Sequence, residues 1–294
     1  MTGLGEVITA MVTPFNQELE VDLNLTHKLM EYLVSNGSDG ILLSGTTGES
    51  PTLSDQEKLK LFKYAKENFG SQAKIVAGTG SNDTRHTVEL SRQAEQLGVD
   101  ALLIVTPYYN KPTPEGVYRH FEAVASKVSL PIIVYNVPGR TGTNIDCSTC
   151  IRLSKIDNIV GIKEASGNLS QISEIARAKD KDFIIYSGND CDTLPILSIG
   201  GQGVISVASH LMGKQIKKMI GAFKDSDIQQ ARDINNSLMD FFKVIFITTN
   251  PVPIKEALNL AGLDVGKTRL PLWQMEDYKK EKLIDILKKY SIIE

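Results

Sequence analysis

The sequence predicts an α/β fold, a closed (β/α)8 TIM barrel with a C-terminal helical extension. Eight short apolar runs rich in Ile and Val recur between residues 7 and 208, and they are too continuous for half-exposed strands. Segments with helical periodicity separate these runs, as expected for parallel strands joined by helices. No G-x-G-x-x-G follows a run, and a doubly wound sheet usually has fewer strands, so we favour the barrel.

The expected strands follow one another at similar intervals. Residues 37–43 read GSDGILL and residues 98–104 read GVDALLI, and this spacing corresponds to two repeat units of roughly 30 residues. The expected strands are residues 7–13, 40–44, 74–78, 101–106, 131–136, 159–164, 183–187 and 203–208.

The helical segments carry start and stop signals. Ser54 and Glu57 form a capping box before an apolar stripe that ends at Gly70, and a second stripe covers residues 83–97. Beyond residue 211 the chain reads as successive helices, with no strand-like run longer than residues 244–248. We therefore divide the chain into a barrel, residues 1–221, and a helical extension, residues 222–294.

The composition is that of a globular chain that binds neither nucleic acid nor membranes. The 32 Lys and Arg residues against 35 Asp and Glu give a net charge of −3, which offers no basic field for phosphate backbones or anionic lipids. The start of the chain lacks the features of a secretory signal, and no apolar stretch approaches the roughly 20 residues of a membrane span. We therefore expect a cytoplasmic protein.

Metal and redox chemistry are not expected. Cys147 and Cys150 have C-x-x-C spacing, but a zinc or redox role would want a second ligand pair or a thioredoxin-like context, and the sequence shows neither. The four histidines are scattered at no metal-ligand spacing. We interpret the cysteines as ordinary residues and expect no catalytic metal.

Candidate catalytic residues stand where the expected strands end, because active sites of such barrels lie at the carboxyl ends of the strands. Lys163 ends an otherwise apolar strand. It is either an ordinary lysine that extends out of the barrel mouth or pairs with Glu164, or an amine whose pKa is lowered by desolvation. Such an amine attacks a ketone and forms a Schiff base.

Three further strand ends carry polar and aromatic side chains. Thr46 and Thr47 stand in a glycine-flanked turn. This turn either binds a small carboxylate or is only a tight connection between a strand and the next helix. Tyr109 follows the fourth strand, Tyr135 lies in the fifth, and Arg140 follows it with a guanidinium suited to a carboxylate. Each tyrosine alone is more often a core or rim residue, but the whole set meets the needs of an aldol addition through an imine.

Motifs in a fixed order extend over nearly the whole chain. They are Thr13-Pro-Phe15, Gly45-Thr-Thr-Gly-Glu49, Val105-Thr-Pro-Tyr-Tyr-Asn-Lys-Pro112, Tyr135-Asn-Val-Pro-Gly-Arg-Thr141, Gly161-Ile-Lys-Glu-Ala-Ser166, Ser187-Gly-Asn189, Gly203-Val-Ile-Ser206, Asn250-Pro-Val-Pro253 and Arg269-Leu-Pro-Leu272. Any one motif is weak evidence, whereas their order and spacing are specific. The sequence closely resembles the dihydrodipicolinate synthase (4-hydroxy-tetrahydrodipicolinate synthase) family of pyruvate-dependent class I aldolases, to which N-acetylneuraminate lyase is related.

This resemblance implies roles for the residues at the strand ends. Lys163 would form the imine with pyruvate, and Thr47 with its neighbouring backbone would hold the pyruvate carboxylate. Tyr135 would act as general acid and base, linked through Thr46 to Tyr109, which in the family reaches in from a neighbouring subunit. We therefore expect a homo-oligomer, either a tetramer formed as a dimer of dimers or a dimer.

The second substrate implied by the resemblance is L-aspartate 4-semialdehyde. Arg140 would bind its carboxylate, and backbone around Gly188 and Ile205 would complete the pocket. The implied reaction is the Schiff-base condensation of both substrates to 4-hydroxy-tetrahydrodipicolinate, in the diaminopimelate route to lysine, with no cofactor besides the imine on Lys163. Within the family, the alternative is N-acetylneuraminate lyase or a 2-keto-3-deoxy-sugar-acid aldolase, and Thr46 and Arg140 disfavour both of these enzymes. An alternative from a different class is a non-catalytic metabolite-binding barrel.

The family pattern also includes a site between subunits at which L-lysine inhibits many bacterial members. Here Asp55 and Lys58 stand where two histidines are usual, and His86 stands where a glutamate is usual. The added ammonium and the missing carboxylate disfavour a cationic ligand. We therefore expect insensitivity to L-lysine.

Overall fold

The computed structural model describes residues 3–294 and confirms the closed barrel of eight parallel strands. Adjacent strands pair in sequence order and β1 pairs with β8, so the sheet has no free edge. Met1 and Thr2, which begin the stretch interpreted as free of a secretory signal, lie outside the described residues. The strands are β1 (Val7–Ala10), β2 (Gly40–Leu43), β3 (Lys74–Gly78), β4 (Ala101–Val105), β5 (Ile132–Asn136), β6 (Ile159–Glu164), β7 (Ile184–Ser187) and β8 (Gly203–Ser206).

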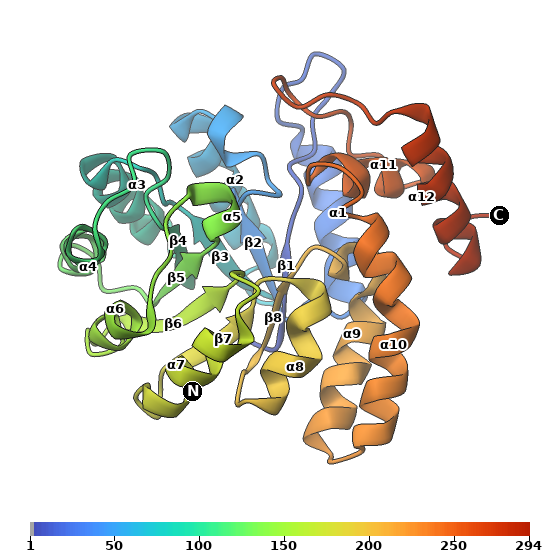
Figure 1. Ribbon diagram of the computed structural model, residues 1–294. Helices are drawn as coiled ribbons and strands as arrows, with labels where there is room; N and C mark the ends of the chain where they lie inside the picture. The colour runs from blue at the N-terminus through green and yellow to red at the C-terminus, as the bar shows by residue number, and fades with distance from the viewer. Residues whose placement is uncertain (1–2) are drawn as a thin grey trace.

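Helices cover the outside of the barrel and continue beyond it (Figure 1). They are α1 (Leu23–Ser35), α2 (Asp55–Phe69), α3 (Thr84–Gln96), α4 (Pro114–Ala125), α5 (Pro138–Thr141), α6 (Cys147–Leu153), α7 (Leu169–Ala178), α8 (Thr193–Ser198), α9 (Ser209–Lys224), α10 (Ile228–Val244), α11 (Val252–Leu260) and α12 (Asp277–Lys289). Two short 3-10 turns, η1 (Ser50–Thr52) and η2 (Asp190–Asp192), stand after β2 and β7. None of the helices formed by residues 3–294 has the length and apolarity to cross a membrane.

The local signals in the sequence act as predicted. The Glu57 N–H donates to the Ser54 hydroxyl at 3.2 Å and the Ser54 N–H donates to the Glu57 carboxylate at 2.8 Å, which completes the capping box of α2. Some predicted strands extend past the observed ones, as for residues 7–13 against Val7–Ala10. Residues 11–13 are buried but do not belong to the sheet. The predicted strand is too long because an apolar run indicates burial and does not by itself indicate strand pairing.

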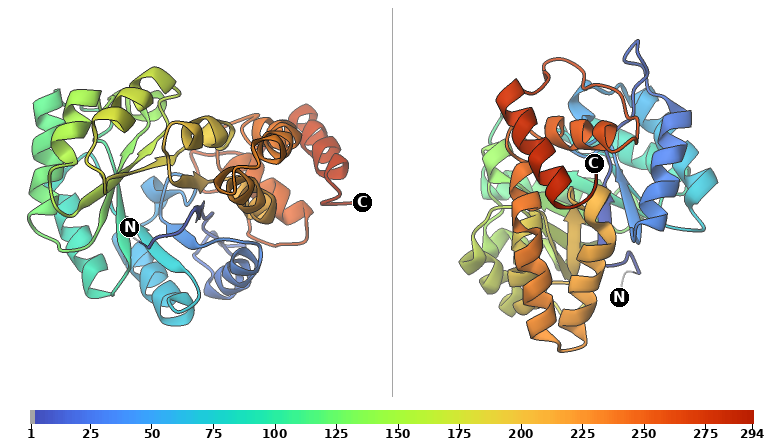
Figure 2. Two further views of the ribbon diagram at one scale, coloured as in Figure 1. Left: turned by 90° about the horizontal axis from the view of Figure 1, so that it is seen from below. Right: turned by 90° about the vertical axis from the view of Figure 1, so that its right-hand side faces the viewer.

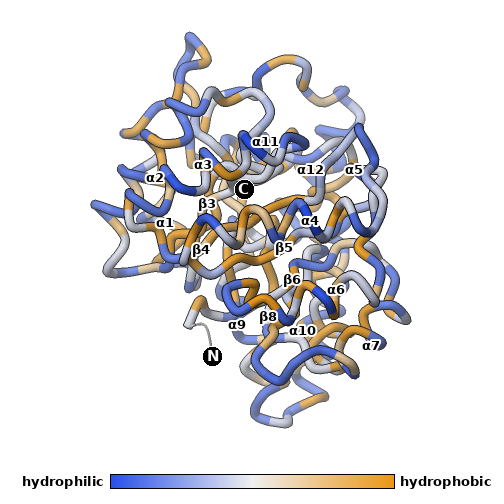
Figure 3. Tube along the Cα trace, turned by 90° about the vertical axis from the view of Figure 1, so that its left-hand side faces the viewer, coloured by the Kyte–Doolittle hydropathy of each residue, from blue (hydrophilic) through white to orange (hydrophobic). Residues whose placement is uncertain are grey.

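The strands carry two layers of core side chains. One apolar cluster fills the barrel and a second packs between the strands and the helices, so the hydrophobic colour concentrates on the strands (Figure 3). Lys163 of β6 pairs in register with Tyr135 of β5 and with Tyr186 of β7, both of which belong to the inner cluster. Registered neighbours on parallel strands point to the same face, so Lys163 also lies inside the barrel.

The helices after β8 lie on one side of the barrel (Figure 2). Helix α9 packs on β1, α10 packs on α9, and α12 packs on both α10 and α11. The predicted boundary between residues 221 and 222 falls inside α9, because the chain turns only after Lys224. The division into two domains stays a prediction.

Candidate active site

Lys163 is a buried amine near the carboxyl end of β6. Only 5% of the residue is exposed, and burial lowers its pKa to about 8. The negative charge of Asp190 opposes this shift, and the positive charge of Arg140 adds to it. About a tenth of such amines are neutral at pH 7, against fewer than about one in a thousand for an exposed lysine. Lys163 therefore does not extend out of the barrel mouth and is suited to act as a nucleophile.

Tyr135 lies beside Lys163. The Lys163 Nζ is 4.3 Å from the centroid of the Tyr135 ring, and the two residues pair in register. Burial raises the pKa of Tyr135 to about 12, although the Arg140 charge and the Thr46 hydroxyl oppose this shift. Tyr135 is therefore protonated at neutral pH and can donate a proton to a group bound near Lys163.

A cavity of about 240 Å³ lies where β2, β3, β4 and β5 end. Thr46, Tyr135 and Arg140 are among the residues that line it, so the structure brings these three predicted residues together. Lys163 and Thr47 are buried outside this lining. The cavity can therefore hold a small substrate against the Tyr135 hydroxyl, with the Arg140 guanidinium to bind an anionic group.

Gly188 and Ile205 lie at the ends of the neighbouring strands. The Gly188 N–H donates to the Glu164 carbonyl at 2.7 Å, directly after Lys163. A Cβ on Gly188 would stand 2.7 Å from the Cβ of Ala165, so only glycine permits this close approach. Ile205 is fully buried in the inner cluster of the barrel.

Tyr109 is not brought to the site within a single chain. It is 90% exposed, has a φ of +75°, and is absent from the lining of the cavity. The adjacent Tyr108 lines the cavity instead. Within the described chain, the predicted link from Tyr135 through Thr46 therefore stops at Thr46.

Two buried residues near the site had no role in the sequence-based prediction. Asp190 accepts hydrogen bonds from the Ser206 hydroxyl and from the Ala208 N–H at 3.1 Å, and burial raises its pKa. Asn250 donates from its side-chain amide to the Thr47 hydroxyl at 2.9 Å. Asp190 directly follows the motif that ends at Asn189, and Asn250 begins another motif, so position within these motifs was the only available signal.

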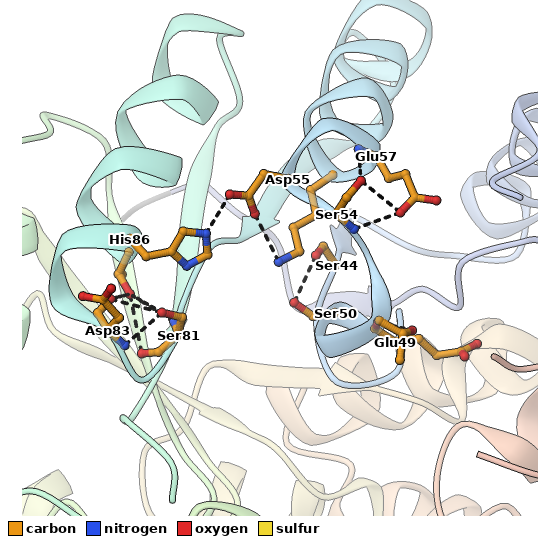
Figure 4. Close-up of polar contacts among 12 residues, drawn as sticks. Ser44, Glu49, Ser50, Ser54, Asp55, Glu57, Ser81, Asp83 and His86 are labelled. Carbon is orange, nitrogen blue, oxygen red and sulfur yellow. Dashed lines mark hydrogen bonds and ion pairs between the residues drawn. The ribbon is translucent and has the colours of Figure 1, made fainter. Parts of the chain in front are cut away.

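The residues that depart from the regulatory pattern form a cluster between α2 and α3 (Figure 4). Asp55 contacts His86 Nε2 at 2.7 Å and Lys58 Nζ at 3.6 Å. Burial lowers the pKa of Lys58, and the Asp55 charge opposes this shift. These residues border a second cavity of about 450 Å³, and Tyr108 lines both cavities.

The C-x-x-C pair lies at the start of α6. Cys147 and Cys150 are free thiols, and burial raises the pKa of both. Across residues 3–294, no group of three or more His, Cys, Asp or Glu side chains is placed to hold a metal ion.

A buried lysine of lowered pKa beside a tyrosine, inside a (β/α)8 barrel, defines the site of a lysine-dependent aldolase. Residues 3–290 match the sequence profile of the dihydrodipicolinate synthetase family. The 4-hydroxy-tetrahydrodipicolinate synthase of Heliobacterium modesticaldum is 53% identical over 288 residues, which cover 98% of this chain and 96% of the relative. The chain therefore belongs to the dihydrodipicolinate synthetase family.

Solved structures agree with this assignment. Dihydrodipicolinate synthase from Cyanidioschyzon merolae, with lysine bound, has a TM-score of 0.96 at 43% identity and covers 99% of each chain. A monomeric dihydrodipicolinate synthase variant has a TM-score of 0.97 at 38% identity and covers 99% of this chain and 98% of its own. These relatives favour a synthase over the N-acetylneuraminate lyase alternative.

Proposed function

We propose that the chain condenses pyruvate with L-aspartate 4-semialdehyde to give 4-hydroxy-tetrahydrodipicolinate, through an imine on Lys163. The observation that carries the proposal is the buried Lys163 amine 4.3 Å from the Tyr135 ring, in a chain whose relatives are 4-hydroxy-tetrahydrodipicolinate synthases. The chain is accordingly a lyase of the class I aldolase type. This activity belongs to the diaminopimelate route to lysine.

The chemistry begins with the neutral Lys163 amine. Its lone pair attacks the keto carbon of pyruvate, and the keto oxygen takes up protons and leaves as water, which forms the imine. Loss of a methyl proton gives an enamine, whose carbon attacks the aldehyde carbon of the second substrate. The amine of the condensed product then displaces Lys163 and closes the ring, so no further cofactor is required.

Tyr135 supplies and recovers protons in this scheme. Its raised pKa makes it a poor base alone, so a hydrogen-bonded relay would restore its proton. Thr46 lies beside it and would pass the proton on to Tyr109 of a neighbouring subunit. The support for a shared site is the exposure of Tyr109, and it favours a homo-oligomer, a dimer or a tetramer.

The two carboxylates would bind at different points. Thr47 and its backbone would hold the pyruvate carboxylate, and backbone around Gly188 and Ile205 would close the pocket beside the imine. Arg140, which lines the cavity, would bind the carboxylate of the aldehyde in a bidentate manner. Location in the cytoplasm stays a prediction.

The test is reduction of the imine with borohydride in the presence of pyruvate. We expect an irreversible mass increase on Lys163 by peptide mapping, and none in Lys163→Ala. Lys255 is an internal control, because it is also buried and burial also lowers its pKa to about 8, but its ammonium is already paired with the Glu49 carboxylate at 2.8 Å. An adduct on Lys255, or none at all, would contradict the proposal. A coupled assay with N-acetylneuraminate as the alternative substrate tests the choice within the family.

A further inference from the structure

One sequence motif without an assigned role and helix α11 both contact the turn that follows β2. The Thr13 hydroxyl donates to the Gly48 carbonyl at 2.7 Å. Glu49 has a left-handed backbone with a φ of 57° and forms a buried ion pair with Lys255 of α11 at 2.8 Å. Glu49 points away from the Asp55 and His86 cluster (Figure 4). The C-terminal extension therefore holds one side of the turn that carries Thr47.

A second motif, which begins at Asn250, reaches Thr47 itself. The Asn250 side-chain amide donates to the Thr47 hydroxyl at 2.9 Å, and both residues are buried, at 5% and 3% exposure. The Asn250 side-chain carbonyl oxygen is also buried and meets no donor among residues 3–294. A buried amide that leaves one atom unpaired costs stability, so its single hydrogen bond requires an explanation.

Asn259, in the same extension, shows what a structural asparagine does here. Its amide donates to the Gly266 carbonyl at 3.0 Å, and its carbonyl accepts from the Val265 N–H at 2.8 Å. Both of its polar groups are satisfied by backbone, and they fix the loop after α11. Asn250 instead donates its one hydrogen bond to the side chain of Thr47.

The direction of that hydrogen bond determines what Thr47 can do. A threonine hydroxyl has one hydrogen to donate and two lone pairs to accept with. When Asn250 donates to the oxygen, the hydroxyl hydrogen must point elsewhere, and no acceptor for it occurs in the part of the chain that the structure describes. The Thr47 hydroxyl is therefore preset as a free donor, which is the state that binds a carboxylate.

We propose that Asn250 is a positioning residue for the keto acid: it holds the Thr47 hydroxyl so that its hydrogen points at the substrate carboxylate. This inference rests on the proposed function, in which Thr47 binds the pyruvate carboxylate. Asn250 acts only through Thr47. Its removal weakens the binding of pyruvate and leaves the binding of the aldehyde at Arg140 unchanged.

The test measures two quantities. One is the pyruvate concentration that half-saturates borohydride trapping, called here the pyruvate value, and the other is KM for each substrate. In Asn250→Ala we expect the pyruvate value to rise about tenfold, as for one lost oriented hydrogen bond to a charged group. KM for the aldehyde should stay within about twofold. Asn250→Asp should bind pyruvate more weakly than Asn250→Ala, because a carboxylate accepts the Thr47 hydrogen and repels the substrate.

A double-mutant cycle with Thr47→Val shows whether Asn250 acts through Thr47. In the Thr47→Val background, adding Asn250→Ala should change the pyruvate value no further. Asn259→Ala is the matched control, since it removes an asparagine of the same extension that does not contact Thr47. It should lower the melting temperature without changing the ratio of the two KM values.

The outcomes separate the two proposals. Wild-type protein that is not trapped by pyruvate overturns the proposed function, and with it the role of Asn250. Trapping of the wild type with an unchanged pyruvate value in Asn250→Ala overturns only the inference about Asn250. A full effect of Asn250→Ala in the Thr47→Val background, or equal rises in both KM values, assigns Asn250 a general structural role and also overturns it. Should Asn250→Ala fail to fold, Asn250→Leu, which is uncharged and of similar volume, decides by the same criteria.

Discussion

Lys163 and Lys255 share a lowered pKa of about 8, and their neighbours distinguish them. The Lys255 ammonium lies 2.8 Å from the Glu49 carboxylate and 4.1 Å from the centroid of the Phe15 ring. A directly contacting carboxylate therefore balances its positive charge. Lys163 has no carboxylate at ion-pair distance anywhere in residues 3–294, and Asp190 acts on it only through its charge. A buried lysine without a direct counter-ion is the better nucleophile, because less electrostatic energy is lost when it gives up its proton.

The lowered pKa of Lys163 predicts the pH dependence of imine formation. The neutral amine reacts, and its fraction rises about tenfold per pH unit below the pKa and levels off above it. The trapping rate with pyruvate and cyanoborohydride should therefore rise with a midpoint near pH 8. In Arg140→Ala the midpoint should move to higher pH, because the Arg140 charge helps to lower this pKa. A rate independent of pH between 6 and 8 would contradict this assignment.

Replacing Arg140 should separate the two substrates. Arg140 lines the cavity and is assigned to the carboxylate of the aldehyde only, so Arg140→Ala should still form the pyruvate adduct at pH 9. Loss of a charge-assisted, bidentate contact should raise KM for L-aspartate 4-semialdehyde by about ten- to a hundredfold. Arg140→Lys keeps the positive charge but lacks the planar guanidinium that binds a carboxylate through two hydrogen bonds. Its KM for the aldehyde should therefore lie between those of the wild type and Arg140→Ala. Loss of pyruvate trapping in Arg140→Ala would show that the assignment is wrong.

The turn after β2 depends on the C-terminal extension for its stability. Lys255→Met would leave the buried Glu49 carboxylate without its partner, and we expect a loss of about 3 to 5 kcal/mol in the free energy of unfolding. Adding Glu49→Gln should recover most of this loss, because the buried charge is then absent. Urea unfolding measures both changes. The exposed pair of Lys63 and Glu67, 3.9 Å apart, is the control, and Lys63→Met should change stability little.

Equal losses in the single Lys255→Met variant and in the double variant would contradict this account. The cost would then lie in the lost packing of the lysine side chain rather than in an unpaired charge.

The cluster between α2 and α3 predicts insensitivity to L-lysine. Asp55 is the carboxylate of this cluster, and it is already engaged by His86 at 2.7 Å and by Lys58 at 3.6 Å. A cationic ligand would have to displace these groups and would meet the ammonium of Lys58. Activity should therefore stay unchanged as L-lysine is added up to the millimolar range. Inhibition at sub-millimolar concentration would show that the cluster rearranges to accept a cation.

The sequence predicted elements better than the contacts between them. Strand order and the capping box of Ser54 follow from local pattern, because burial and capping depend on near neighbours in the chain. For Lys163 the sequence left open whether the amine is buried or extends out of the barrel mouth, and the structure places it inside the barrel. The contact of Asn250 with Thr47 joins residues 203 positions apart, and no periodicity reports such a contact. The predicted domain boundary between residues 221 and 222 falls inside α9, since an amphipathic pattern continues from α9 into α10 with only a short turn between them.

The molecule as a whole leaves large apolar side chains uncovered. Tyr109 is 90% exposed, and Leu270 and Trp273 are each 68% exposed. Exposed aromatic and aliphatic side chains of this size are typical of surfaces that a partner covers. The shared-site proposal gives Tyr109 such a partner, namely a second copy of this chain in which it completes the relay at Tyr135.

Subunit mixing tests the shared site directly. Lys163→Ala lacks the nucleophile and Tyr109→Phe lacks the end of the relay, so each variant alone should be nearly inactive. When the two are unfolded and refolded together, a mixed dimer has one complete site, because the Tyr109→Phe chain keeps its own Lys163 and receives an intact Tyr109. Half of the dimers are then mixed and half of their sites are complete, which returns about a quarter of wild-type activity. If exchange is confirmed and the mixture stays as inactive as its parents, Tyr109 acts within its own chain, and its exposure must have another cause.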